Sequence, residues 1–120
     1  MSVSGSILGI GTDICAIARI EAGLARFGEK FLHRVLAPAE REGTWGPRQL
    51  ARRWAMKEAV AKAIGHGIGG HVGFHDIVIT RDALGKPHCA VVGYEGYTVH
   101  VSASDDAAYA TAFAVIERAA

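Results

Sequence analysis

The fold is decided by residues 52–65, which read RRWAMKEAVAKAIG. The apolar side chains of this stretch share one broad arc of a helical wheel: Ala55, Met56, Ala59, Val60, Ala63 and Ile64. Glu58 and Lys62 fall outside this arc and lie four residues apart, about one helical turn. We therefore expect a long helix that buries one face and presents a carboxylate and an ammonium group together.

This charged pair has two interpretations. A glycine-rich run, GHGIGG at residues 65–70, follows the helix. Carboxylates bind hard cations, while ammonium groups and glycine-rich backbone bind phosphate oxygens, so the segment suits a metal and phosphate site. Alternatively, Glu58 and Lys62 form a surface pair that stabilises the helix by roughly 0.2–0.5 kcal/mol. The stretch alone favours the surface pair, and the rest of the chain shifts that balance.

Strand and helix signals precede the long helix. Residues 7–11 form a short apolar run typical of a buried strand. Thr12 and Asp13 follow as a strand-to-helix junction, where either side chain would cap the next helix. Residues 16–27 carry apolar side chains at three- and four-residue spacing, which predicts a helix, and residues 31–36 repeat the pattern more briefly.

Prolines and a glycine mark where the helices begin and end. Pro38 ends the short helix, because the residue before a proline disfavours helical geometry. Pro47 opens the long helix at a position where its missing N–H costs little, and Gly65 closes it.

The second half of the chain changes to a strand pattern. Strands are expected over residues 76–80, 88–92, 98–104 and 109–117. The first two are joined by the turn sequence DALGKP, and the last two by Asp105 and Asp106. One strand, then helices, then a run of antiparallel strands predicts an α+β fold with an antiparallel sheet packed against the long helix. We expect residues 1–120 to form a single domain.

Composition restricts the class of protein. The net charge of +1 provides no basic field, which disfavours nucleic-acid binding. No apolar run approaches the roughly 20 residues that cross a bilayer, and the opening residues MSVSG lack a signal-peptide pattern, so no membrane association is expected. Cys15 and Cys89 have no CxxC spacing, so we expect small buried hydrophobic residues in a cytoplasmic protein. His66, His71, His75 and His100 show no metal-ligand spacing and are expected mostly on loops or strand surfaces.

Three segments together carry a family resemblance. GIGTDI at residues 9–14, RWAMKEAVAKAIG at residues 53–65 and VHVS at residues 99–102 resemble the holo-acyl-carrier-protein synthase family of 4′-phosphopantetheinyl transferases. The DALGKP turn is similar to the hairpin turn of that family, and the order and spacing agree from residue 7 onward. The resemblance implies the 4′-phosphopantetheinyl transferase fold. It also implies transfer of phosphopantetheine from coenzyme A to a serine of an apo acyl carrier protein, releasing adenosine 3′,5′-bisphosphate, in support of fatty acid biosynthesis.

The resemblance implies a role for each residue of the central pair. Asp13 and Glu58 match the carboxylates that hold Mg²⁺. Two carboxylates suffice, because Mg²⁺ keeps several waters and takes only one or two protein carboxylates with substrate phosphate. Lys62 would lie at the same diphosphate and stabilise or protonate the leaving phosphate. Glu58 and Lys62 are thus expected in catalysis.

Further residues match positions for coenzyme A and for the carrier protein. Arg53, Lys62 and Gly65 are expected at coenzyme A, although an arginine that snorkels at the helix start is the alternative for Arg53. Arg19 matches an arginine that receives the acidic carrier protein. Arg26 lies on nearly the same helix face, where a solvated surface is the alternative.

The chain departs from the family pattern at one position. Many relatives carry histidine where this chain has Asp105, and that histidine has been considered for proton transfer. The general base therefore has three candidates: Asp105, Asp106, or a metal-bound water near Glu58. A silent module that binds coenzyme A or carrier protein and a diphosphate hydrolase are the competing functions.

The resemblance also implies a homotrimer with active sites at the subunit interfaces. A 120-residue subunit offers little concave surface for a ligand as long as coenzyme A. The apolar side chains of the last strand would supply the shared core, and their burial within one subunit is the alternative: Tyr109, Phe113, Val115 and Ile116.

Overall fold

The computed structural model describes residues 6–70 and 72–119, so that the opening residues MSVSG and His71 lie outside it. Its three helices are α1 (Ile17–Phe27), α2 (Glu29–Val35) and α3 (Pro47–Ile64). Its five strands are β1 (Ile7–Ala16), β2 (Ile77–Arg81), β3 (Pro87–Val91), β4 (Tyr97–Asp105) and β5 (Tyr109–Arg118). Two 3₁₀ turns, η1 (Pro38–Glu40) and η2 (Phe74–Asp76), lie on either side of α3 in the sequence.

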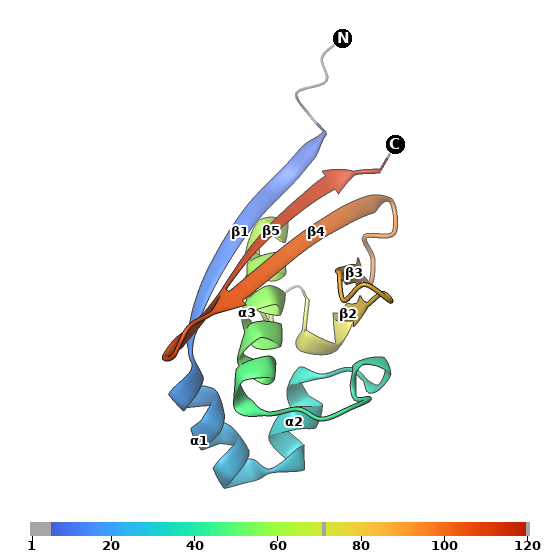
Figure 1. Cartoon of the computed structure of the whole chain (residues 1–120). Coiled ribbons are helices and arrows are strands. Elements are labelled where there is room, and N and C mark those ends of the chain that lie inside the picture. Colours follow the sequence, from blue (N-terminus) through green and yellow to red (C-terminus); the bar gives the residue numbers. More distant parts are fainter. Residues whose placement is uncertain (1–5, 71, 120) are drawn as a thin grey trace.

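The strands form one antiparallel sheet in the order β1-β5-β4-β3-β2. The long strands β1, β5 and β4 run side by side across α3, while α1 and α2 lie at one end of that helix and β2 and β3 lie beside it (Figure 1). β3 joins β4 through the single register pair Cys89 and Val99, whereas β4 and β5 pair along their whole length. The expected α+β fold, an antiparallel sheet packed against a long helix, is confirmed.

Two glycines let β1 lie directly against the backbone of α3. A Cβ atom added at Gly9 would lie 2.0 Å from the carbonyl oxygen of Ala63, and one added at Gly11 would lie 2.0 Å from that of Ala59. No side chain fits at such distances, so only glycine permits this approach. Since alternate residues of a strand share a face, Asp13 follows on the same side of β1 and points toward α3.

The expected ends of the helices are largely confirmed. α3 begins at Pro47 and ends at Ile64, and Gly65 caps it with a φ of 109°, in the left-handed region that favours glycine. α1 begins one residue after the expected start and ends at Phe27 as expected.

The expected helix cap at Thr12 or Asp13 is wrong. β1 continues through both residues to Ala16, and the residue before α1 makes no side-chain cap. The strand is longer than its apolar run because β1 pairs with β5 as far as Ala16 and Tyr109. Long-range pairing of this kind leaves no local signal in the sequence.

α3 is buried on more sides than the helical wheel indicates. The expected apolar residues are buried or half-buried, but so are Arg53 and the fully enclosed Lys57. A helix between a sheet and two further helices has little free surface, which explains why α3 places two cations inside the protein.

The last strand divides its apolar residues between two faces. Ile116 is fully buried against the core, whereas Tyr109 is 47% exposed and Phe113 is 45% exposed. The expectation of an outward apolar surface therefore fits Tyr109 and Phe113, and burial within the subunit accounts for Ile116.

The remaining expectations concern cysteines, histidines and membrane spans. Cys15 is buried, Cys89 is half-buried against the core, and both are free thiols. Burial raises the pKa of Cys89 to about 12. His66, His75 and His100 are exposed, as expected. Within residues 6–70 and 72–119, no helix is long and apolar enough to cross a membrane.

Candidate active site

The side chains of Asp13, Glu58 and Lys62 come together where β1 crosses α3. Lys62 Nζ lies 3.1 Å from Asp13 Oδ1 and donates a second hydrogen bond, also 3.1 Å long, to the carbonyl oxygen of Thr12. The Asp13 side chain is only 13% exposed, whereas that of Lys62 is 54% exposed. The site therefore has an enclosed carboxylate and an ammonium group open to solvent.

Glu58 joins this group from the neighbouring turn of α3. Burial raises the pKa of its carboxyl, and the negative charge of Asp13 raises it further. Lys62, Arg19 and a hydrogen bond from the backbone of Ile68 oppose this shift. Because repulsion between charges weakens with distance, the effect of Asp13 on the pKa of Glu58 indicates that the two carboxylates lie near each other.

This donor set fits a hard cation. A cation between the two carboxylates would offset their mutual repulsion, which adds to burial in raising the pKa of Glu58, and oxygen donors are the ligands Mg²⁺ prefers. Within the described ranges, no group of three or more His, Cys, Asp and Glu side chains lies close enough to hold a metal ion. Asp13 and Glu58 would therefore supply two ligands and leave the others to water or substrate.

A second charged cluster lies inside the protein on the opposite side of α3. Glu40 Oε1 accepts a hydrogen bond of 2.5 Å from Lys57 Nζ, and Glu40 Oε2 accepts one of 3.0 Å from Arg53 Nη1. Neither the Glu40 nor the Lys57 side chain is exposed. Lys57 also donates to the carbonyl oxygens of Val35 and Phe74, so that one ammonium group joins η1, η2 and the end of α2.

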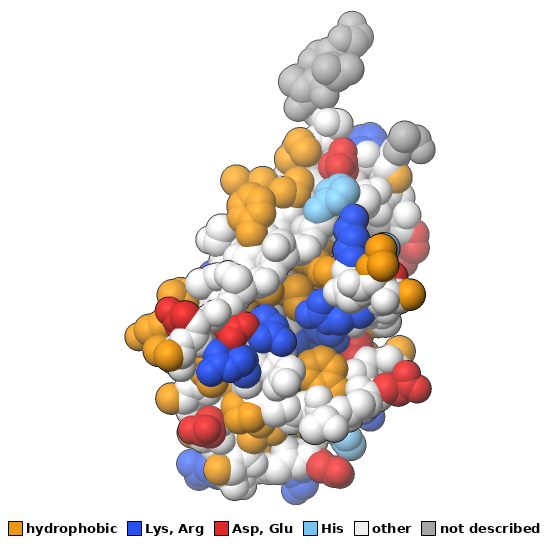
Figure 2. All heavy atoms as spheres, viewed as in Figure 1, with side chains coloured by type: hydrophobic (Ala, Val, Ile, Leu, Met, Phe, Trp, Pro, Cys, Tyr) orange, Lys and Arg blue, Asp and Glu red, His pale blue; other side chains and the backbone are white. Residues whose placement is uncertain are grey.

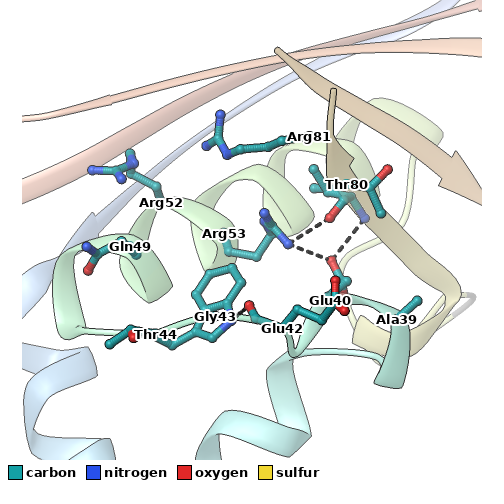
Figure 3. Close-up of a pocket in the computed structure, with 12 residues that line it drawn as sticks. Ala39, Glu40, Glu42, Gly43, Thr44, Gln49, Arg52, Arg53, Thr80 and Arg81 are labelled. Atoms are coloured by element: carbon teal, nitrogen blue, oxygen red, sulfur yellow. Dashed lines mark hydrogen bonds and ion pairs between the residues drawn. The ribbon is translucent and has the colours of Figure 1, made fainter. Parts of the chain in front are cut away.

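A cavity of about 360 Å³ opens beside this buried cluster. Three arginines line it: Arg52 and Arg53 from α3, and Arg81 from the end of β2 (Figure 3). Trp45 forms part of the wall, with its ring 4.8 Å from the guanidinium carbon of Arg53. Lys and Arg side chains gather in the middle of the face shown in Figure 2. The concentration of guanidinium groups suits a phosphorylated ligand.

Arg53 lies in the wall of this cavity rather than at the surface. Its side chain is 5% exposed, and Nη1 donates to Glu40 and to the carbonyl oxygen of Ile79. Its Nε is buried and has no hydrogen-bond partner among the residues that the structure describes. The snorkelling alternative therefore does not describe Arg53.

Gly65 lies at the other end of α3, about two turns beyond Glu58. It is exposed, and its N–H donates to the carbonyl oxygens of Ala61 and Lys62. Gly65 follows Lys62 by three residues, at the end of α3. Arg53 lies on the opposite side of the helix, where it faces the cavity.

Asp105 lies at the end of β4 and faces two arginines of α3. Its Oδ1 accepts from Arg52 at 2.5 Å and its Oδ2 accepts from Arg48 at 2.6 Å. These two hydrogen bonds hold the pKa of the Asp105 carboxyl below its ordinary value. The neighbouring Asp106 accepts hydrogen bonds from the backbone of Ala108 and Tyr109 and shapes the turn between β4 and β5.

The two arginines of α1 have separate neighbours. The guanidinium of Arg19 lies over the Trp54 ring at 5.3 Å, and its charge reaches Glu58. The guanidinium of Arg26 lies over the ring of Phe27 at 5.2 Å. Arg19 therefore connects the surface of α1 to the carboxylate site, whereas Arg26 contacts the end of its own helix.

Sequence reasoning missed most of the cavity. No local signal separates the lining residues Glu40 and Arg81, or the adjoining buried Lys57, from surface charges. Arg52 was visible as the first residue of the central stretch, but its partner Asp105 lies 53 residues away.

Comparisons with known proteins agree with this geometry. The family model described as the 4′-phosphopantetheinyl transferase superfamily matches residues 9–114. The holo-[acyl-carrier-protein] synthase of Vibrio cholerae is 42% identical over 93% of this chain and 98% of its own length. The synthase of Thiobacillus denitrificans is 44% identical over 95% of this chain and 96% of its own length.

Solved structures extend the agreement to three dimensions. The holo-(acyl-carrier-protein) synthase of Bacillus anthracis, in complex with CoA (3′,5′-ADP), matches with a TM-score of 0.83 at 38% identity, over 95% of this chain and 99% of that one. The Neisseria meningitidis synthase matches with a TM-score of 0.82 at 40% identity, over 93% and 99% of the two chains. The expected fold family is confirmed, and the chain belongs to the 4′-phosphopantetheinyl transferase superfamily.

Proposed function

We propose that this protein is a holo-[acyl-carrier-protein] synthase that transfers 4′-phosphopantetheine from coenzyme A to a serine of an apo acyl carrier protein, in support of fatty acid biosynthesis. The serine Oγ forms a bond to the β-phosphorus of coenzyme A. The bond between that phosphorus and the bridging oxygen breaks, and adenosine 3′,5′-bisphosphate leaves. The observation that carries the proposal is the meeting of Asp13, Glu58 and Lys62 at the contact between β1 and α3, in a member of this family.

Asp13 and Glu58 are proposed to hold Mg²⁺. When bound there, Mg²⁺ neutralises negative charge on the diphosphate oxygens. The enclosed Asp13 carboxylate supports this role, as does its charge, which adds to burial in raising the pKa of Glu58, because a cation stabilises two neighbouring carboxylates.

Lys62 is proposed to stabilise the leaving phosphate. Its two hydrogen bonds, to Asp13 and to the Thr12 carbonyl, fix the ammonium group beside the carboxylates. An ammonium group has three N–H donors, so one remains for a diphosphate oxygen. A fixed donor aimed at developing negative charge lowers the activation barrier, because it needs no reorganisation during the reaction.

The proton of the serine hydroxyl needs an acceptor. Asp105 suits this task poorly, because Arg48 and Arg52 occupy both of its carboxylate oxygens and hold its pKa low. We therefore assign proton acceptance to the surroundings of Glu58.

Coenzyme A is proposed to bind between the carboxylate site and the arginine-lined cavity. Arg53 and its neighbours Arg52 and Arg81 would attract its phosphates, and Gly65 would allow its diphosphate to approach the end of α3. The acidic carrier protein would dock on α1, where Arg19 lies between the surface and Glu58 and where Arg26 adds a second cation.

Self-association is proposed to complete the site, and the family resemblance indicates a homotrimer. The outward face of β1 and β5 carries Ile10, which is 62% exposed, and Ile14, which is 64% exposed, in addition to Tyr109 and Phe113. Thr12 and Phe113 are register partners, so these side chains form one surface across two adjacent strands. Apolar side chains gather along this edge of the molecule in Figure 2. Apolar surface of this kind marks protein interfaces. Light scattering should give three times the subunit mass, and a fully active monomer would contradict this assembly.

The proposed substrates imply a cytoplasmic protein. One incubation with these substrates tests the proposed reaction. The protein is mixed with coenzyme A, Mg²⁺ and an apo acyl carrier protein, and the carrier is weighed by intact-mass spectrometry. A mass gain of one phosphopantetheine on the carrier serine supports transfer. Cleavage of coenzyme A without that gain indicates a hydrolase, and binding without cleavage indicates a silent module.

A further inference from the structure

The carboxylate of Asp105 lies between two arginines that project from the same face of α3. Arg48 and Arg52 are four residues apart, so their like charges would repel without a partner between them. Asp105 divides its two oxygens, with Oδ2 for Arg48 and Oδ1 for Arg52. Its side chain is 15% exposed, whereas those of Arg48 and Arg52 are 46% and 25% exposed, so the bridge lies at the surface with its carboxylate partly covered.

The bridge is fixed at its β4 end. Asp105 is the last residue of β4 and is the register partner of Ala110 in β5, so its backbone is held by the sheet. Arg48 adds a second connection, because its Nη1 also donates to the carbonyl oxygen of Asp106. Arg52, in contrast, has Asp105 as the one partner recorded for its side chain in the described part of the chain.

Arg52 also lines the arginine-lined cavity (Figure 3). A guanidinium group has five N–H donors, and the bond to Asp105 uses one of them. The remaining donors are available to an anion in the cavity. A long side chain that is held by one edge loses less conformational freedom when it binds a ligand with the other.

We propose that Asp105 is a positioning residue for coenzyme A, which holds Arg52 at the cavity so that its free donors meet a phosphate of the ligand. This role rests on the proposed function and differs from that of a general base. For removal of the Asp105 carboxylate, this role predicts a change in phosphate affinity opposite to the change expected from charge alone. Removing a carboxylate makes the cavity more positive, so simple electrostatics predicts tighter phosphate binding, whereas the loss of positioning predicts weaker binding.

Isothermal calorimetry with adenosine 3′,5′-bisphosphate measures this sign directly and requires no transfer reaction. Asp105→Asn keeps the size of the side chain and is expected to raise the Kd about tenfold, equivalent to ~1.4 kcal/mol. Glu42→Gln is the matched control, since it removes a cavity carboxylate that has no recorded arginine partner in the described residues, and it should leave the Kd equal or lower. Adenosine, which lacks the phosphates, should bind both variants and the wild type alike.

A double-mutant cycle identifies the route of the effect. If Asp105 acts through Arg52, then Asp105→Asn should have no further effect on Kd in an Arg52→Gln background. Asp105→Glu should restore part of the affinity. Steady-state kinetics should show a higher KM for coenzyme A with kcat nearly unchanged, whereas loss of a general base lowers kcat.

Each other outcome overturns the inference. Unchanged or tighter binding by Asp105→Asn would contradict positioning, and an equal effect in the Arg52→Gln background would show that Asp105 acts independently of Arg52. If the wild type itself does not bind adenosine 3′,5′-bisphosphate, the proposed function fails and this role fails with it.

Discussion

Lys57 Nζ lies 2.5 Å from Glu40 Oε1, and neither side chain is exposed to solvent. Burial lowers the pKa of Lys57, while its hydrogen bond to Glu40 acts in the opposite direction. The pair belongs to the wall beside the arginine-lined cavity, because the same carboxylate also accepts from Arg53 and from the backbone of Ile79 and Ala37. Four donors thus converge on one glutamate, which fixes α3, η1 and β2 relative to one another.

Glu40→Gln should destabilise the fold by about 3 kcal/mol or more. The substitution leaves two buried cations without a counter-charge, and removing one partner of a buried ion pair costs more than the pair contributes. Urea denaturation measures the loss, with Glu42→Gln as an exposed control that should stay within about 0.5 kcal/mol of the wild type. A Glu40→Gln protein as stable as this control would contradict the role of the buried pair.

Gly11→Ala should destabilise the contact between β1 and α3. The new Cβ would lie 2.0 Å from the carbonyl oxygen of Ala59, so the strand or the helix must move, at a cost of about 1–3 kcal/mol or more. Gly96→Ala is the matched control, because its Cβ would have no neighbour within 4 Å in the described part of the chain. Equal unfolding midpoints for the two variants would show that the close approach is not required.

The sequence predicts the elements that depend on local patterns. Pro47 and Gly65 mark the ends of α3, and the spacing of apolar residues locates α1. β1 is predicted too short, because its extension to Ala16 depends on pairing with β5 about 100 residues away. The side chain of Asp13 suits a helix cap as well as a strand position, and only the pairing of β1 with β5 decides between these two alternatives.

The candidate site likewise contains some residues that the sequence predicts and others that it does not. Glu58 and Lys62 are found from their spacing on one helix, and the family resemblance adds Asp13. The buried pair of Lys57 and Glu40 leaves no signal, because a lysine and a glutamate 17 residues apart have the same local pattern whether they are buried or solvated. Charges that act through tertiary contacts are recognised only when the fold is known.

Lys62→Ala should lower kcat by about 100- to 1,000-fold and raise the Kd for coenzyme A much less. The ammonium group is expected to act on charge that develops in the transition state, and removing one such donor typically costs this much. Single-turnover kinetics with calorimetry separates the two quantities. If Lys62 were only a surface partner of Asp13, kcat would stay unchanged and stability would fall by less than about 1 kcal/mol.

Asp105 should make the stability of the protein depend on pH in acid solution. Arg48 and Arg52 hold its pKa below the ordinary value of 3.8, so between the folded pKa and that value the unfolded chain binds more protons than the folded one. The free energy of unfolding therefore rises with pH across this window, is fully gained above about pH 5, and is lost as the pH falls through the folded pKa.

Urea midpoints of the wild type and Asp105→Asn between about pH 2 and 5 measure this contribution. Asp82 and Glu95 also have lowered pKa values, from causes that do not include Asp105, so their contributions cancel in the difference. The charge of Asp105 opposes the lowering of the pKa of Asp106, so Asp105→Asn lowers that pKa further. The stability advantage of the wild type should shrink toward low pH. A difference that does not change with pH would mean that the bridge to the two arginines does not form in solution.

The central claim is that Asp13 and Glu58 form one Mg²⁺ site for phosphopantetheine transfer. Its most direct test is the intact mass of an apo acyl carrier protein after incubation with coenzyme A, Mg²⁺ and either the wild type, Asp13→Asn or Glu58→Gln. The wild type should convert the carrier to the holo form and lose this activity with excess EDTA. Circular dichroism should show that each variant keeps its fold. Each variant should transfer phosphopantetheine at least about 100-fold more slowly than the wild type, because several kcal/mol of charge stabilisation is lost. Near wild-type conversion by either folded variant at ordinary Mg²⁺ concentrations would contradict the claim.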